Sequence, residues 1–462
     1  MKKRVVMALM ALSMTMGACT KQEAPTQTQT QTQTQTQAQT QTQTETPTAT
    51  PVSGEEPTPF VSSGNAQNLT EQIGTISAPD AEITDAQKEA LSKASLQLFA
   101  KAVAEEGEHS NVLLSPTSIQ LAFGMTENGA NGETLEQMEQ VIGGGVSIDE
   151  MNPLLCGLSD RFRSAQDVKW NVANSIWFKD DGACSVKDEF AQKALSWYGA
   201  DIWKAPFDDT TLADINGWVN SETKGMIPEI LDEIPPDARM YLINAMAFEG
   251  EWMKEYEESD ILEGCSFTNE DGSKTDVTML YSTEERYFTL GNGTGFLRNY
   301  KGGEYSFMGL LPEEGTDLDA YIAELAEEDA DLAAAIRESE YGTVIVRIPE
   351  FTDDYDIEMS DMLTGMGMDI AFDPLRADFS NILETKDGED FPVCINRVLH
   401  KTHIEVDREG TRAAAVTAIE TADAACEPVV DPVCIYLNRP FLYGIIDNET
   451  GLPVFLGCVN SL

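Results

Sequence analysis

Residues 405–424 read EVDREGTRAAAVTAIETADA, and this stretch decides the fold. No Gly or Pro occurs from Thr411 to Glu427, so the stretch alone fits an Ala-rich helix, a loop or a strand. In a strand, alternate residues face opposite sides. One face would then carry only uncharged, mostly small side chains: Thr411, Ala413, Ala415, Thr417, Ile419 and Thr421. The charges of Arg412 and Glu420 fall on the other face. A segment placed like an exposed loop but patterned like a buried strand suggests two conformations for one sequence.

The chain around this stretch reads as helices first and strands later. A helical pattern begins at Thr84, and Ser115-Pro116 starts a second helix, with Pro in the first turn. Strand-like runs follow at Trp170–Phe178, Met240–Phe248, Tyr305–Leu311, Thr343–Ile348 and His403–Val406. Because no internal repeat and no strict alternation of strand and helix is visible, we predict one α+β domain on large antiparallel or mixed sheets.

The N-terminus reads as a processing segment. Lys2, Lys3 and Arg4 precede an apolar run, Val5–Ala18, which is too short to span a bilayer comfortably. The small residues before Cys19 look like a bacterial lipobox, so we predict a signal peptide at 1–18 and a lipid on Cys19. An ordinary secretory signal with a chance cysteine is the alternative. Either reading places the protein outside the cytoplasm, lipid-anchored at a bacterial cell surface or secreted.

A low-complexity segment follows the leader. Residues 27–44 are almost pure Thr-Gln repetition, and Thr, Pro, Gly and Ser dominate up to about Ser77. Such a composition offers no apolar face to bury. We therefore predict a disordered, lipidated tether at 19–78 and the folded domain at 79–462.

Composition and motifs exclude several functions. With 30 Lys+Arg against 79 Asp+Glu, the net charge of −49 argues against nucleic acid and anionic lipid as partners. The GxSxG, HExxH and GxxxxGK[ST] motifs are absent, and the seven cysteines after Cys19 form no CxxC pair. The histidines are His109, His400 and His403, and strand alternation would send the last two to opposite faces. We expect no enzyme, metal site or cofactor.

Several ordered motifs resemble the serpin family over essentially all of 79–462. They include NVLLSPTSI at Asn111–Ile119, LINAMAFEGEW at Leu242–Trp252 and IYLNRPFLY at Ile435–Tyr443. The resemblance implies a fold of three β-sheets with about nine helices and an exposed reactive-centre loop. It also implies a monomeric inhibitor that forms a covalent complex with a serine protease. The cleaved loop then inserts into the main sheet as a new strand. In a departure from the family, Arg408 and Arg412 replace the usual glutamates.

The resemblance also implies residue roles. Gly410 and Thr411 would begin the hinge, followed by the residues that slide between strands: Ala413, Ala414, Ala415, Val416 and Thr417. Trp252 would lie beneath the entry point of the loop. A polar cluster under the opening sheet would comprise Ser115, Ser118, Asn244 and His400. Outside such a role, His400 would be an ordinary core histidine and Trp252 plain core packing.

The family's loop length places the reactive bond fourteen residues after Gly410, at Ala424–Ala425. Alanine suits a shallow, apolar specificity pocket, so we expect an elastase-like target. The longer downstream segment leaves Ala422–Asp423 and Ala425–Cys426 as alternatives. Subtilisin-like and papain-like targets also stay open, as does a non-inhibitory surface binding protein. A hydrolase using Ser, His400 and an acid is disfavoured, because no nucleophile motif is present.

Overall fold

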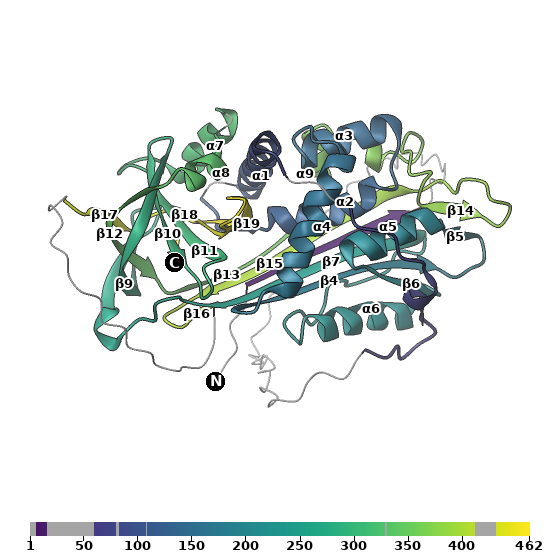
Figure 1. The fold of residues 1–462 in the computed structure, drawn as a ribbon, viewed down its shortest axis with the longest axis horizontal. Helices are drawn as coiled ribbons and strands as arrows, with labels where there is room; N and C mark the ends of the chain where they lie inside the picture. The colour runs from purple at the N-terminus through teal and green to yellow at the C-terminus, as the bar shows by residue number, and fades with distance from the viewer. Residues whose placement is uncertain (1–5, 16–59, 80–82, 108, 329, 412–430) are drawn as a thin grey trace, which may run out of the picture.

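The computed structural model describes residues 6–15, 60–79, 83–107, 109–328, 330–411 and 431–462. Within these residues the chain forms three β-sheets, two of them large, with helices covering both faces of the first (Figure 1). The expected α+β architecture, with three sheets and nine helices in the described residues, is confirmed.

The first large sheet has eight strands, which run antiparallel except for the parallel pair β4–β6. From one edge to the other its strands are β13 (Phe351–Glu358), β15 (Cys394–Val406), β1 (Val6–Thr15), β7 (Ala238–Glu251), β4 (Val168–Lys179), β6 (Asp201–Ala205) and β2 (Gln67–Asn68). The short strand β16 (Gly410–Thr411) pairs with the end of β7.

The second large sheet has nine strands. Its order is β17 (Val433–Tyr436), β12 (Glu340–Pro349), β9 (Lys274–Leu290), β10 (Gly293–Asn299), β11 (Tyr305–Leu311), β18 (Phe441–Asp447), β19 (Pro453–Val459) and β3 (Val112–Leu114), with β8 (Ile261–Thr268) paired to β9. The third sheet contains only β14 (Leu383–Thr385) and β5 (Cys184–Val186).

Nine α-helices lie within the described residues. They are α1 (Asp85–Glu106), α2 (Pro116–Glu127), α3 (Gly132–Ile142), α4 (Ile148–Ser164), α5 (Asp188–Tyr198), α6 (Asp209–Glu222), α7 (Leu318–Glu327), α8 (Leu332–Arg337) and α9 (Ser360–Gly365). Short 3₁₀ turns are η1 (Thr70–Gln72), η2 (Glu258–Asp260) and η3 (Ile370–Phe372).

The two helices predicted from the sequence begin where their caps place them. Thr84 and Gln87 form a reciprocal capping box at the start of α1. Ser115 caps α2 by accepting a hydrogen bond from the backbone of Ser118, and Pro116 occupies the first helical position. Four of the five predicted strand runs fall within the longer strands β4, β7, β12 and β15, and the fifth, Tyr305–Leu311, coincides with β11.

Both faces of the first sheet are buried near its middle. Helix α2 packs against β7 and β1 on one face, and α6 lies on the opposite face (Figure 1). Under α6, Trp177 of β4 stacks on Trp203 of β6 with ring centroids 4.9 Å apart, and Trp218 of α6 meets Trp177 edge-on. This double burial explains why β7 reads as a nearly continuous apolar run.

The folded part of the chain begins before residue 79, where the sequence placed its start. Phe60 packs edge-on against Trp203, with ring centroids 5.6 Å apart. The buried Asp214 carboxylate of α6 accepts hydrogen bonds from Ser62 and Ser63. Strand β2 then pairs with β6. The polar composition concealed this docking, because the segment borrows its apolar and charged partners from distant elements.

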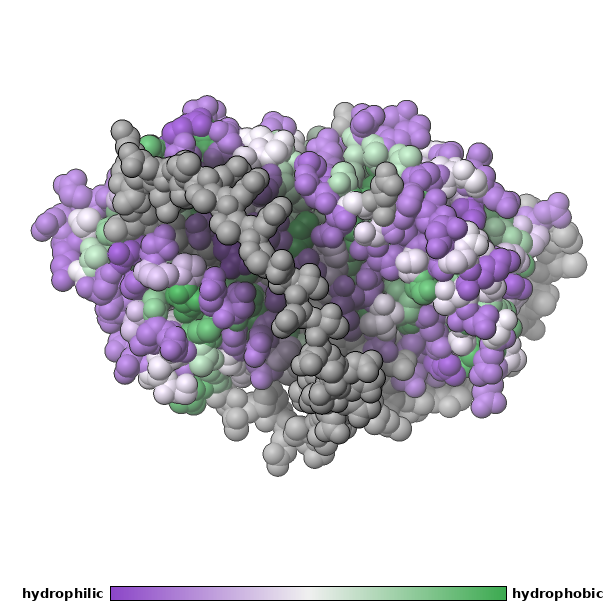
Figure 2. Space-filling model, turned by 180° about the vertical axis from the view of Figure 1, so that it is seen from behind, coloured by the Kyte–Doolittle hydropathy of each residue, from purple (hydrophilic) through white to green (hydrophobic). Residues whose placement is uncertain are grey.

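The face seen in Figure 2 is mostly hydrophilic, and its apolar residues are scattered in small groups. A membrane-crossing helix is not found in the part of the chain that the structure describes.

Candidate strand-insertion site

The hinge begins as an extra strand on β7. Gly410 and Thr411 form β16 and pair antiparallel with Glu251 and Gly250. A tight turn precedes them, in which the backbones of Asp407 and Gly410 exchange hydrogen bonds of 3.3 and 3.4 Å. The chain leaving β15 therefore turns back and starts to run along β7.

Gly410 is required at this turn for two physical reasons. Its φ of +110° lies in a region that residues with a Cβ rarely adopt. A Cβ would also lie 2.6 Å from the Gly250 carbonyl oxygen and 2.7 Å from the Trp252 backbone nitrogen. The backbone of the turn thus approaches β7 as closely as glycine allows.

Trp252 fixes the turn from below, where the sequence placed it. Its indole Nε1 donates a 2.9 Å hydrogen bond to the Asp407 carbonyl oxygen. The wholly buried ring stacks on Tyr300 at 4.9 Å, and the Arg298 guanidinium lies 4.9 Å from its centroid. This packing fixes the position of the start of the hinge relative to the end of β7.

Arg408 holds the outer side of the same turn. Its guanidinium makes two parallel hydrogen bonds to the Glu350 carboxylate, at 2.9 and 3.1 Å. These contacts raise the pKa of Arg408 and keep it charged. Arg408, which departs from the family pattern, is thus paired with Glu350 in the connection between β12 and β13.

The four predicted cluster residues meet where α2 begins beneath β7 and β15. Ser118 Oγ donates a 2.5 Å hydrogen bond to Asn244 Oδ1, and His400 Nε2 accepts one of 3.1 Å from the Ser115 backbone. Ser115 Oγ donates to the Val454 carbonyl oxygen of β19. All four residues are fully buried. His400 therefore faces a backbone amide inside the core, which also speaks against a hydrolase built on it.

The cluster extends further than the sequence indicated. Asn244 Nδ2 donates a 2.6 Å bond to Asn174 Oδ1, and Asn174 Nδ2 donates to the Tyr198 carbonyl oxygen. Asn174 lies directly opposite Asn244 on β4. Its position in a run of six buried strand residues, 173–178, could have signalled it, since a buried amide needs partners. We call these five residues the polar cluster: Ser115, Ser118, Asn174, Asn244 and His400.

Strand β1 lies between β7 and β15, above the polar cluster. It runs antiparallel to both neighbours, and Met10 pairs with Asn244 on one side and with His400 on the other (Figure 1, purple strand). The sequence assigned these residues to a removable leader, and that assignment stays a prediction. In the full chain the segment completes the middle of the sheet.

Other predicted site residues lie outside the described part of the chain. They are Cys19, the hinge residues Ala413, Ala414, Ala415, Val416 and Thr417, and the bond Ala424–Ala425. The far end of the loop is placed, because β17 pairs in parallel with β12 in the second sheet. The two described ends of the loop are thus held by different sheets.

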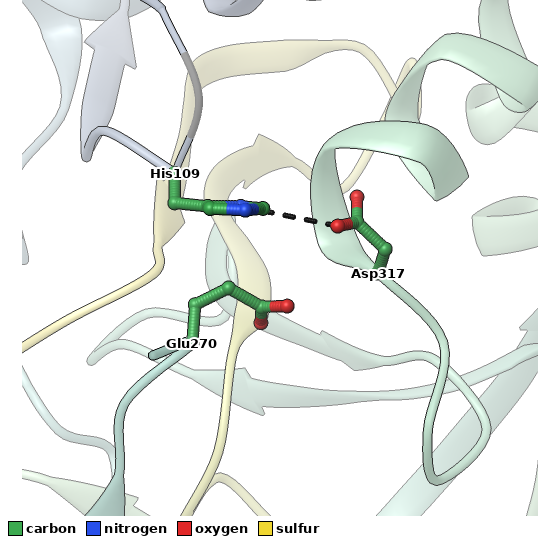
Figure 3. A group of neighbouring side chains, drawn as sticks. All are labelled: His109, Glu270 and Asp317. Carbon is green, nitrogen blue, oxygen red and sulfur yellow. Dashed lines mark ion pairs between the residues drawn. The ribbon is translucent and has the colours of Figure 1, made fainter. Parts of the chain in front are cut away.

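The remaining histidines lie apart from this site. His403 lies three residues after His400 on β15, so the two side chains face opposite sides of the sheet. The His403 ring contacts Asp354 rather than the core. His109 Nδ1 lies 3.9 Å from an Asp317 oxygen (Figure 3). It also lies 3.5 Å from an oxygen of Asp319. Glu270 lies beside His109 and Asp317 (Figure 3). Its partial burial is the largest cause that raises its pKa, and the nearby Asp317 carboxylate raises that pKa further. The interaction shown is an ion pair at the start of α7.

Comparison with known proteins assigns the fold to a class. Residues 89–462 match the family model described as serpin, serine protease inhibitor. The chain therefore belongs to the serpin family, whose members are generally serine protease inhibitors.

Individual relatives agree. Iripin-8 from Ixodes ricinus is 30% identical over 373 residues, covering 77% of this chain and 89% of its own. Human Serpin B8 is 29% identical over 376 residues, covering 79% and 96%. The crystal structure of tengpin, a thermophilic serpin, in its native state has a TM-score of 0.76 at 37% identity, covering 86% of this chain and all of tengpin. Thyroxine-binding globulin, solved with thyroxine, shares the fold at 21% identity, with a TM-score of 0.65 and coverage of 80% and 98%.

Proposed function

We propose that this chain is an irreversible suicide-substrate inhibitor of extracellular serine proteases with elastase-like specificity. The observation that carries the proposal is β16, which pairs the first two hinge residues with β7. The chain is already aimed along the edge where an inserted loop would run. In protein without residues 6–15, only the residues beyond Thr411 would have to move.

The register of β16 says where each hinge residue would come to lie. Extending it along β7 places Ala413 opposite Phe248 and Thr417 opposite Asn244. Thr417 would then enter the sheet at the level of the polar cluster. Hydrogen bonds that link β7 and β15 to α2 can rearrange there as the strands separate. This supports a role for the polar cluster in sheet opening.

The chemistry expected at the loop is an interrupted acyl transfer. The serine oxygen of the protease attacks the Ala424 carbonyl carbon, and the Ala424–Ala425 peptide bond breaks. The amine of Ala425 leaves with the proton that the protease's histidine took from the serine. An ester joins Ala424 to the protease, and insertion of the loop would separate that ester from attacking water.

The driving force is completion of the sheet. Each added backbone hydrogen bond contributes about 1 kcal/mol net, and ordering of the chain offsets part of this gain. The inserting face carries no charge, so no uncompensated ion would be buried. The same face argues against a non-inhibitory role, in which insertion would be unnecessary.

Mixing protein 19–462 with pancreatic or neutrophil elastase tests the proposal on denaturing gels. A covalent complex is expected. Cleaved monomer without a complex would make the protein a substrate, and ester turnover without a protease would make it an enzyme. Mass spectrometry of the released C-terminal fragment locates the bond. A fragment starting at Ala425 is expected, whereas one starting after Glu427 would overturn the assignment.

Two hinge variants separate insertion from simple binding. Thr411→Arg would put an unpaired charge on the inserting face, so insertion should slow and the variant should be cleaved as a substrate. Arg412→Ala, on the other face, serves as the matched control and should still form the complex. Equal loss of inhibition in both variants would refute the assigned register.

We also propose that Cys19 carries lipid and that the mature protein is held outside the cytoplasm at a bacterial surface. The lipobox-like sequence before Cys19 supports this. Incorporation of labelled palmitate should occur in the wild type and disappear in Cys19→Ser. Equal labelling of the two proteins would contradict the proposal.

A further inference from the structure

The middle of the first sheet is filled by the N-terminus of the chain. Val6 to Met14 lie opposite Phe248 to Met240 of β7, and Met7 to Ser13 lie opposite residues of β15. Without β1, the two neighbouring strands would face each other across an open position. Unpaired strand edges readily accept another extended segment.

This position coincides with the predicted path of the loop. If the β16 register continued along β7, Ala413 would lie opposite Phe248, where the structure places Val6. The same offset places Met10 where Thr417 would insert and Met14 where Thr421 would insert. Both segments would need the same backbone groups of β7, so they cannot occupy the position together.

The composition of the segment suits such a position. Residues 6–15 read VMALMALSMT, without proline, glycine or charge. Every residue can donate a backbone hydrogen bond to the ladder, and no ion needs to be desolvated. Covalent attachment makes occupancy an intramolecular event that requires no second molecule.

We propose that Val6–Thr15 is an intramolecular ligand of the position between β7 and β15, which keeps the unprocessed chain from inserting its loop. This inference rests on the proposed function. The full chain would be cleaved by a protease without retaining it, and removal of residues 1–18 would make the inhibitor competent. The family match begins at residue 89, so removing the leader leaves that whole region intact.

Four proteins made by cell-free translation test the inference: 1–462, 19–462, and the full chain carrying Leu9→Pro or Leu9→Ile. Proline removes one ladder donor, whereas isoleucine retains it and provides the matched control. Complex formation with elastase should be about tenfold or more lower for 1–462 than for 19–462. Leu9→Pro should behave like 19–462, and Leu9→Ile like the full chain. Equal complex formation by 1–462 and 19–462 would overturn the inference.

Melting temperatures keep this test independent of the proposed function. Nicking the loop should raise the melting temperature of 19–462 but not that of 1–462, whose sheet is already complete. A synthetic peptide of residues 6–15 should raise the melting temperature of intact 19–462. If neither protein retains elastase, the proposed function fails, but these shifts still report occupancy. Equal shifts on nicking, with no effect of the peptide, would overturn the inference.

Discussion

The two buried interfaces of the first sheet are built from different chemistry. Beneath β7 and β15, hydrogen bonds of 2.5 and 3.1 Å in the polar cluster link Asn244 and His400 of the sheet to the start of α2. At the edge strand β13, Phe351 meets Tyr443 of the second sheet edge-on at 5.0 Å, and Phe441 packs beside both.

This difference in chemistry indicates which interface of the first sheet can rearrange and which cannot. Hydrogen bonds between side chains can be exchanged for others when strands separate, provided that each buried group finds a partner. Interlocked aromatic rings have no equivalent second arrangement, since any displacement opens a cavity. We infer that the sheet opens above the polar cluster, while the aromatic contacts hold the second sheet in place.

The largest effect is expected at the aromatic interface. Phe441→Ala should cost about 3–5 kcal/mol of stability, because it removes a fully buried ring. Loop-intact and loop-nicked protein should lose the same amount, since β18 keeps its partners. Denaturant titration of both forms measures this. The milder Phe441→Leu serves as control, and an unequal loss would show that the aromatic interface rearranges.

A pH effect is expected at the same interface. Burial, the largest cause, raises the pKa of Asp353 to about 6, although Tyr443 donates a hydrogen bond to its carboxylate. The folded state therefore binds the proton more tightly than the unfolded chain. Protonation of Asp353 therefore stabilises the folded state fully below about pH 4, and this stabilisation is lost as the pH rises through about 6.

Asp353→Asn should consequently stabilise the protein at pH 8, by up to about 3 kcal/mol at roughly 1.4 kcal/mol per pKa unit. At pH 4 the variant and the wild type should differ little. Chemical denaturation at the two pH values measures both differences. If the stability of the variant relative to wild type were lower at pH 8 than at pH 4, the pKa of Asp353 would not be raised in the folded state.

A smaller but more selective effect is expected in the polar cluster. Ser118→Ala removes the donor to Asn244 Oδ1 and should cost about 1–3 kcal/mol in the loop-intact form. Ser95→Ala is the matched control, because that buried hydroxyl donates within α1 to the Leu91 carbonyl oxygen. Ser118→Ala should change the stability gained on nicking, and Ser95→Ala should not. The same change in both variants would remove the special role of the polar cluster.

The smallest effect is expected at the turn before the hinge. Arg408→Lys loses the paired contact with Glu350, but both groups are partly exposed. The loss should be below about 1 kcal/mol, and complex formation should be retained. Rates of complex formation measured for both proteins test this, and a tenfold decrease would mean that the ion pair controls hinge movement.

The sequence predicted the elements whose signals are local. The caps at Thr84 and Ser115 and the strand runs can each be read from a few neighbouring residues, whereas the hinge at Gly410 came from the family resemblance. The four original members of the polar cluster came from the family resemblance, because their contacts join distant elements. Asn174 was missed as a partner for the same reason.

The placement of residues 6–15 and 60–79 could not be read locally. An uncharged apolar run has the same composition whether it is a leader or an inner strand. Phe60 and the two serines after it gain their stability from Trp203 and Asp214, which lie far away in the sequence. Such pairings depend on the finished sheet rather than on local preference.

The central claim is that the position between β7 and β15 accepts the loop in the protein without its leader. Melting protein 19–462 before and after a metalloprotease nicks its loop tests this most directly. A gain of several kcal/mol from the new strand should raise the melting temperature by several degrees, at roughly 1 °C per kcal/mol for a domain of this size. Intact and nicked protein that melt at the same temperature would contradict the claim.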